Sequence, residues 1–389
     1  MQAVRERFGS YEIYEELGAG GLASVHLARS PAIKNPVALK RLYPHITSVR
    51  ELVASFVDEA RLARYLQHPG IARIYEYGRL RGTYFIAFEF VPGPTLQQLQ
   101  KHCDAHVGRI PIPVVLEIAH QLCDALDHAH NLRDRVGIPL GIVHRDVSPS
   151  NVNIASSGQV KLIDFGLAKS KQQTVQSQAG VLKGKLNYIA PEYLSGKLDA
   201  RCDLWALGVC MYELLTGRRL FDAPEQGAIL ERVRAMPIPP PSRANRDVPR
   251  EVDQIVLTAL ERDPAKRWQS AAAMRGAIAA YDGRRLTQQQ LVTWVEWAFS
   301  QKQIIHENSG LSVLHEIIES KPVVEVGGQM HAMSQAMEER RRESLAAGIP
   351  PTGATRIHHR ASRRWVWIAL LVLVAVVAGL VIAFLPGAL

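Results

Sequence analysis

The eight residues from His144 to Asn151 constrain this chain more than any other stretch, because they place a base and a metal ligand in one short segment. They read His-Arg-Asp-Val-Ser-Pro-Ser-Asn, so Asn151 follows Asp146 by five residues. An Asp can accept the proton of an attacking hydroxyl, and the amide oxygen of an Asn at this spacing can ligate a magnesium ion. Since eight residues can match by chance, the rest of the chain has to support this interpretation.

A glycine-rich segment near the N-terminus, Gly18 to Val25, is the second feature. Apolar and polar side chains alternate around glycines over residues 11–43, which predicts antiparallel strands on both sides of this segment. Small residues allow backbone N–H groups to approach phosphates closely. A plain tight hairpin is the alternative, and Ala23 stands where a third glycine would be expected. The strand–turn–strand context argues against a dinucleotide-binding βαβ unit.

Two charged residues at strand ends extend the pattern. Lys40 ends an apolar strand, which is unusual unless its ammonium has a partner, and Glu59 on the helix predicted over 51–67 is a candidate for that partner. Asp164 follows the apolar run 160–163 and precedes Phe-Gly, where a carboxylate is well placed to bind a cation. A surface ion pair and an ordinary turn are the respective alternatives.

Periodicity predicts a small β-rich lobe followed by a larger helical lobe, which is an α+β architecture. Residues 71–91 continue the strand pattern. Apolar residues at helical spacing then predict helices over 112–132, 203–216, 225–235, 251–260 and 270–281.

One more helix is predicted from Thr287 to about Gln301, because Thr287 and Gln290 form a capping box. Its apolar stripe favours docking on the preceding lobe, and a dimerisation helix, which would make the chain a homodimer, is the alternative. A short helix is also expected between Leu311 and Ser320.

The C-terminal residues predict a membrane anchor. Residues 365–385 carry no charge over a length that suffices for a helix to cross a hydrocarbon core of about 30 Å. Basic residues and tryptophans at the start of this run favour an orientation with the bulk of the chain in the cytoplasm. We therefore expect a single-pass membrane protein, with a flexible basic juxtamembrane linker over 321–364 and an extracytoplasmic stub over 386–389.

The net charge of +9 does not predict nucleic-acid binding. Much of the excess lies in the linker, and the sequence has neither zinc-ligand spacing nor an aromatic-basic motif. The four cysteines lack CxxC spacing, which favours reduced, buried thiols.

Taken together, these features resemble the eukaryotic-like (Hanks-type) protein serine/threonine kinases of bacteria. The resemblance rests on motifs that occur in the family's order: Gly18–Val25, Lys40, Glu59, His144–Asn151, Asp164-Phe165-Gly166 and Ala190-Pro191-Glu192. It covers residues 11–282 and implies the two-lobed kinase fold. The implied divisions are an N-terminal extension (1–10), a small lobe (11–88), a hinge (89–93), a large lobe (94–282) and a helical extension (283–320).

The resemblance implies an activity that transfers the γ-phosphoryl group of ATP to protein substrates, with Mg²⁺ as cofactor and Mn²⁺ as an alternative metal. Asp146 is then the catalytic base, Lys40 binds the α- and β-phosphates and pairs with Glu59, and Asn151 and Asp164 bind the metal ions. Phe88 resembles the gatekeeper, and the main chain of Glu89 and Val91 is expected to hold the adenine. The remaining nucleotide contacts are implied for Leu17, Gly18, Ala19, Gly20, Gly21, Leu22, Ala23, Ser24, Val25, Ala38 and Asn153.

Structural and regulatory roles are implied for a second group of residues. Glu192 is expected to pair with Arg267, and Asp203 to brace the loop that contains His144 and Arg145. In the family, such an arginine usually pairs with a phosphorylated residue of the activation loop. We therefore expect phosphorylation at Thr174 or Ser177 to order that loop.

Three positions depart from the family pattern. Ser148 replaces the Lys that usually follows the catalytic Asp by two residues, and Lys185 replaces the Thr of the Gly-Thr pair before Ala-Pro-Glu. We expect Lys185 to restore the positive charge near the γ-phosphate. Asn153 replaces an apolar residue under the adenine, where it either weakens nucleotide binding or pairs with the backbone and changes little. The same Ser and Lys are similar to a myxobacterial subgroup, which favours an active enzyme.

The main alternative is a membrane-anchored pseudokinase that binds nucleotide as a scaffold. Ser148, Ala23 and Asn153 favour this interpretation. Lys40, Asp146, Asn151 and Asp164 favour catalysis, because a scaffold needs neither a base nor metal ligands. A kinase of small molecules is disfavoured by Ala-Pro-Glu and a phosphorylatable loop, which suit a protein substrate.

Overall fold

The computed structural model describes residues 4–165, 185–196, 198–281 and 285–301, together with Leu314 and Ile317. The chain divides into two units, Met1–Gln335 and Ala336–Leu389, and every described residue belongs to the first. The predicted activation-loop sites Thr174 and Ser177, the linker over 321–364 and the apolar run over 365–385 lie outside the described residues. Among the helices that are described, none is long and apolar enough to cross a membrane.

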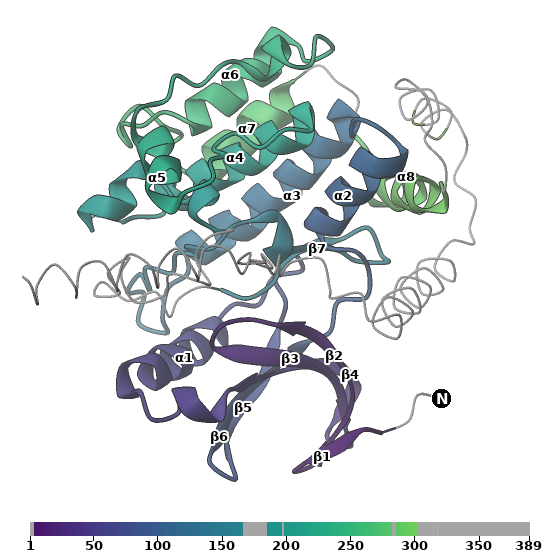
Figure 1. Cartoon of the computed structure of the whole chain (residues 1–389), viewed down its shortest axis with the longest axis vertical. Helices are drawn as coiled ribbons and strands as arrows, with labels where there is room; N and C mark the ends of the chain where they lie inside the picture. The colour runs from purple at the N-terminus through teal and green to yellow at the C-terminus, as the bar shows by residue number, and fades with distance from the viewer. Residues whose placement is uncertain are drawn as a thin grey trace, which may run out of the picture. The chain divides into compact units, whose positions relative to one another are not determined.

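The N-terminal lobe is an antiparallel sheet with one main helix beside it (Figure 1). Its strands follow the order β1-β2-β3-β4-β6-β5. Their bounds are β1 Glu6–Phe8, β2 Tyr11–Ala19, β3 Ala23–Ser30, β4 Ile33–Leu42, β5 Ile74–Leu80 and β6 Thr83–Glu89. Helix α1, Arg50–Ala63, packs Phe56 and Ala60 against β3, β4 and β6. The strands predicted over 11–43 and 71–91 are therefore confirmed.

Two details of this lobe differ from the prediction. Strand β1 lies within the segment that was assigned to an N-terminal extension, where it pairs with β2 through Glu6↔Ile13 and Phe8↔Tyr11. Helix α1 ends at Ala63 rather than at Gln67, and a turn at residues 64–65 followed by irregular chain leads to the His-Pro-Gly stop. The sheet nevertheless places Lys40 in the middle strands, opposite Val25 of β3 and Ile86 of β6.

The C-terminal lobe is built from helices around a single apolar core (Figure 1). Its longer helices are α2 Leu96–His106, α3 Ile112–His130, α4 Arg201–Thr216, α5 Gln226–Ala235, α6 Arg250–Ala259, α7 Ala271–Ala280 and α8 Gln288–Ser300. A two-stranded ribbon, β7 Val152–Ile154 and β8 Val160–Leu162, lies on the side of this lobe that faces the sheet. The predicted helices of this lobe agree with α3 to α7 within two residues at each end.

Helix α8 docks on the chain's own C-terminal lobe. The predicted capping box is present, since Thr287 Oγ1 accepts from Gln290 N at 3.2 Å and Gln290 Oε1 accepts from Thr287 N at 2.9 Å. The apolar stripe is buried in the main core, and His102 of α2 makes a 2.9 Å hydrogen bond with the carbonyl of Ala298. Docking is therefore the confirmed interpretation, because the stripe that a dimer would use is already covered. Leu314, also helical, adds to the same core.

Candidate active site

Lys40, Glu59 and Asp164 form a partly buried charge cluster between the two lobes. The Lys40 Nζ atom lies 3.4 Å from Glu59 Oε1 of α1 and also contacts Asp164 Oδ1, which follows β8. Burial by itself disfavours the charged ammonium, but the carboxylates of Asp164 and Glu59 outweigh it and raise the pKa of Lys40. Burial would likewise raise the pKa of Asp164, and Lys40 lowers it instead. The predicted Lys40–Glu59 pair is thus present.

Asp146 is held by two neighbours that orient its carboxylate. The amide nitrogen Nδ2 of Asn151 donates to Asp146 O at 2.8 Å and to Asp146 Oδ2 at 2.7 Å. The ammonium of Lys185 contacts the same Oδ2 atom. Because its nitrogen is engaged, the Asn151 amide keeps its oxygen as the atom that can bind a cation.

Two residues of the site have a left-handed backbone. Arg145 and Asp164 both have φ of 61°, a region that residues other than glycine enter at an energetic cost. Such conformations persist where the surrounding contacts determine them, and they aim the neighbouring side chains in directions that a regular loop does not allow.

Asp203 supplies the contacts that hold the loop around Arg145. Its carboxylate accepts from His144 N at 2.8 Å and from Arg145 N at 2.7 Å, as predicted. His130 at the end of α3 adds a third contact at 2.8 Å between its Nε2 and Asp203 Oδ2, which the sequence did not reveal. Burial would raise the pKa of Asp203, but the bond and charge of His130 lower it. The carboxylate therefore stays charged and keeps its three donors.

The two departures at positions 148 and 185 lie around the same carboxylate. Ser148 is 2% exposed, and its hydroxyl lies 3.1 Å from that of Ser150, so it carries no charge to the site. Lys185 precedes the 3₁₀ turn η4, Leu186–Tyr188, whose Leu186 is buried and whose Tyr188 donates to Glu213 of α4 at 2.7 Å. A cation missing from the loop around Asp146 is therefore present on an anchored neighbouring segment.

The glycine-rich turn lies between β2 and β3, where Gly20 N donates to Ala23 O at 2.9 Å. Ala23 is 6% exposed and packs with Leu42 and Phe56. Its methyl group faces the core of the lobe, so the absence of a third glycine leaves the turn intact.

Phe88 and Glu89 end β6, where Ala38↔Phe88 and Val37↔Glu89 pair with β4. Asn153 of β7 donates through Nδ2 to the carbonyls of Val91 and Gly93 at 3.3 and 3.4 Å. The structure therefore agrees with the expectation that Asn153 finds a backbone partner. Lys161 of β8 pairs with Glu89 at 3.0 Å, a contact that the sequence did not suggest.

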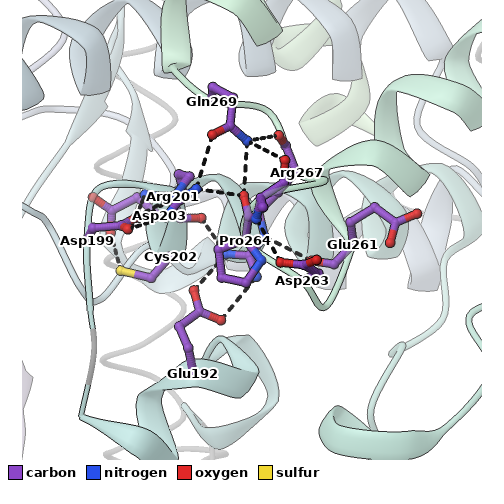
Figure 2. A network of polar contacts seen from close by, with 11 residues as sticks. Glu192, Asp199, Arg201, Cys202, Asp203, Glu261, Asp263, Pro264, Arg267 and Gln269 are labelled. Carbon is purple, nitrogen blue, oxygen red and sulfur yellow. Dashed lines mark hydrogen bonds and ion pairs between the residues drawn. The ribbon is translucent and has the colours of Figure 1, made fainter.

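Glu192 and Arg267 form a largely buried, bidentate ion pair in the C-terminal lobe (Figure 2). Arg267 Nη1 and Nη2 donate to the two Glu192 oxygens at 2.7 and 3.0 Å. The guanidinium also donates to the carbonyls of Glu261 and Arg201 and lies over the ring of Trp205 at 5.2 Å. This pairing was predicted, and it ties the segment after Lys185 to the rest of the lobe.

Comparison with known proteins gives a consistent result. The family model described as "Protein kinase domain" matches residues 11–277. The chain is 36% identical over 284 residues to the tyrosine-protein kinase MasK of Myxococcus xanthus, covering 72% of this chain and 44% of that protein. It is 37% identical to the serine/threonine-protein kinase PknB of Mycolicibacterium smegmatis, covering 70% of this chain and 43% of PknB.

The match to the serine/threonine-protein kinase PrkC of Bacillus subtilis is longer, at 29% identity over 96% of this chain and 52% of PrkC. The chain thus spans about half the length of these relatives or less. Among solved structures, the kinase domain of Mycobacterium tuberculosis PknI is similar with a TM-score of 0.56 and 28% identity, over 73% of this chain and all of that one.

Proposed function

The chain belongs to the protein kinase family, and from this premise we propose that it transfers the γ-phosphoryl group of ATP to Ser and Thr hydroxyls of proteins. One observation carries the proposal: Asp146 is oriented by Asn151 and Lys185, while Lys40, Glu59 and Asp164 are already assembled beside it. A scaffold that only binds nucleotide gains nothing from an oriented base. This geometry therefore favours an active enzyme over a pseudokinase.

The residues present fit a magnesium ion. Asp164 offers a carboxylate and Asn151 an amide oxygen, which are the hard ligands that Mg²⁺ prefers. The described residues contain no cluster of three or more His, Cys, Asp or Glu side chains that could hold a metal ion by themselves. When bound, the metal neutralises charge on the phosphates.

The chain's own groups then perform the transfer. Asp146 accepts the proton of the acceptor hydroxyl as its oxygen forms a bond to the γ-phosphorus, and the bond from that phosphorus to the β–γ bridging oxygen breaks to release ADP. Lys40, held by Glu59, binds the α- and β-phosphates. Adenine donates its 6-amino hydrogen to Glu89 O and accepts from Val91 N–H.

Lys185 is proposed to supply the positive charge that Ser148 lacks. Its contact with Asp146 Oδ2 supports this role, because a phosphoryl group in line with the acceptor hydroxyl lies next to that carboxylate. An ammonium there stabilises the charge that develops on the transferring oxygens.

Two further parts of the proposal concern how the kinase is regulated and where it is located. We propose autophosphorylation at Thr174 or Ser177, supported by the position of Arg145 beside the base. Membrane association is proposed from the uncharged run over 365–385, with the kinase domain in the cytoplasm and membrane-associated signalling as its role.

Tyrosine is a second candidate acceptor. It is favoured by the 36% identity to MasK, which is named a tyrosine-protein kinase. Phosphoamino-acid analysis of the labelled product separates the two acceptors.

The test is transfer of radiolabelled phosphate from ATP by the full chain, with Mg²⁺ and a generic protein acceptor. Wild-type protein should label itself and the acceptor, and Asp146→Asn should not. Labelling that survives Asp146→Asn would contradict the proposal.

A further inference from the structure

Asn153 holds the main chain of the hinge through its side-chain nitrogen. Its Nδ2 atom lies 3.3 Å from the carbonyl oxygen of Val91 and 3.4 Å from that of Gly93. Because both neighbours are carbonyl acceptors, the Asn153 amide must place its nitrogen toward them. The flipped amide would place its oxygen, which cannot donate, against two other oxygens. The residue is 8% exposed, so water does not compete strongly for these bonds.

The other end of the amide shows that this arrangement has a cost. Asn153 Oδ1 is buried and has no hydrogen-bond partner among the described residues. A buried acceptor without a partner destabilises a fold, and an apolar side chain in this place would avoid the loss. Packing therefore does not explain an Asn at this position. What distinguishes it from an apolar residue is the donor group Nδ2.

Neighbouring contacts hold the hinge at the same level. Lys161 is the cross-strand partner of Asn153, and its ammonium lies 3.0 Å from the Glu89 carboxylate. Two backbone bonds from the same ribbon end nearby. Ser156 N donates to the hinge carbonyl of Pro92 at 3.1 Å, and Ile154 N donates to the carbonyl of Pro94, the first residue of the large lobe, at 2.9 Å. The β7–β8 ribbon therefore contacts the hinge region at several points besides Asn153.

The consequence concerns the purine base, and it rests on the proposed function. If adenine bonds Glu89 O and Val91 N–H, its C2 edge lies beside Val91 O, because C6, N1 and C2 are consecutive on the ring. Adenine carries only a C–H at C2 and needs no acceptor there. Guanine and 2,6-diaminopurine carry an amino group at C2, which loses its bond to water on binding and needs a new acceptor.

We propose that Asn153 is a specificity-determining residue that engages one lone pair of the Val91 carbonyl, makes that oxygen a poorer acceptor for a 2-amino group, and so favours adenine over purines that carry one. It acts on the base through Val91, as a positioning residue. A Leu in its place leaves both lone pairs of that carbonyl to a ligand donor, so the selection should weaken.

The experiment compares two nucleotides that differ by one amino group, ATP and 2-amino-ATP (the triphosphate of 2,6-diaminopurine riboside). Their dissociation constants are measured with Mg²⁺ on the full-length wild-type chain, on Asn153→Leu and on Lys161→Met. Lys161→Met is the matched control, since it removes the contact between Lys161 and Glu89 but keeps the bond from Asn153 to Val91 O. Asn153→Ala serves as a second variant in case the Leu side chain does not fit.

Wild type should bind 2-amino-ATP no better than ATP. Asn153→Leu and Asn153→Ala should shift the ratio of the two constants toward 2-amino-ATP by about tenfold, the effect of one hydrogen bond gained. Lys161→Met should weaken both nucleotides and leave their ratio unchanged. An unchanged ratio in the Asn153 variants, or an equal shift in Lys161→Met, would overturn the inference while the proposed function stands. Failure of wild type to bind ATP would contradict the proposed function itself.

Discussion

The ammonium of Lys185 lies against the carboxylate oxygen Oδ2 of Asp146, although 39 residues separate them in the chain. In the family that this chain belongs to, a Lys two residues after the Asp usually holds this place, and here that position is the buried Ser148. The positive charge beside Asp146 therefore lies on the segment that leads into Ala190-Pro191-Glu192 and not on the loop that contains Asp146. That segment is anchored by the Glu192–Arg267 ion pair.

Returning the charge to its usual place should restore activity. We predict that Lys185→Thr lowers kcat and that the double variant Ser148→Lys/Lys185→Thr regains at least about tenfold of it, because one transition-state donor replaces another. Steady-state kinetics with a constant protein acceptor measures this. Ser148→Arg/Lys185→Thr is a useful comparison, since a bulkier cation in the same buried position should recover less. A double variant no better than Lys185→Thr would argue against the exchange.

Removing Arg267 should destabilise the fold. Its side chain is fully buried and that of Glu192 is 11% exposed, so Arg267→Met takes a two-point guanidinium contact away from a largely buried carboxylate. We expect a loss of about 3–5 kcal/mol in the free energy of unfolding, measured by urea denaturation. Arg7→Met is the control, because its pair with Glu12 lies at the surface and should change stability by less than about 1 kcal/mol. Equal effects of the two substitutions would contradict this assignment.

Stability should fall on mild acidification, in part through His120. Burial and the neighbouring Arg285 lower the pKa of His120 to about 4, whereas a His in the unfolded chain titrates near about 6.5. Between these pH values His120 binds a proton in the unfolded state but not in the folded state. The free energy of unfolding therefore falls as the pH drops from about 6.5 toward 4. His120→Gln should reduce the drop in unfolding free energy between pH 7.5 and 5, and His45→Gln, at an exposed position, is measured beside it as the comparison. The partial exposure of His120 keeps the effect below the full linkage value.

The docking of α8 can be tested at one glycine. A Cβ on Gly158 would lie 2.2 Å from the carbonyl oxygen of Gln288 at the start of α8, and φ there is +79°. Gly158→Ala should therefore cost about 1–3 kcal/mol from overpacking in addition to backbone strain. Gly137→Ala separates the two causes, because Gly137 has φ of +85° but nothing within 4 Å of the added carbon. If both substitutions cost the same, strain alone would be responsible and the contact with α8 would be unimportant.

The sequence predicted the parts of this structure that repeat along the chain or follow a motif. Periodicity located α3 to α7, and the capping box located the start of α8. The resemblance placed Lys40 against Glu59 and Glu192 against Arg267, and it also suggested that Lys185 replaces the missing charge. These pairings depend on motif spacing, which can be read without knowing the fold.

Other contacts depend on tertiary structure, and no local signal reveals them. Strand β1 has only three residues and owes its place to pairing with β2 and to the contact of Glu6 with Arg41 at 2.7 Å. His130 reaches Asp203 across 73 residues, and Asn153 reaches Val91 across 62. A sequence offers many possible partners for a polar side chain such as that of His130 or Asn153. Which partner it contacts depends on how the helices and the ribbon pack.

The most direct test of the central claim is the kcat of Lys185→Ala for a protein acceptor at saturating ATP. We predict a loss of about 10²–10³ in kcat, because a transition-state cation is removed from beside Asp146. Lys266→Ala, which removes an exposed lysine of the same lobe, should retain the wild-type kcat. Near-normal turnover by Lys185→Ala would contradict the proposal, because it would show that the charge near the γ-phosphate does not come from Lys185.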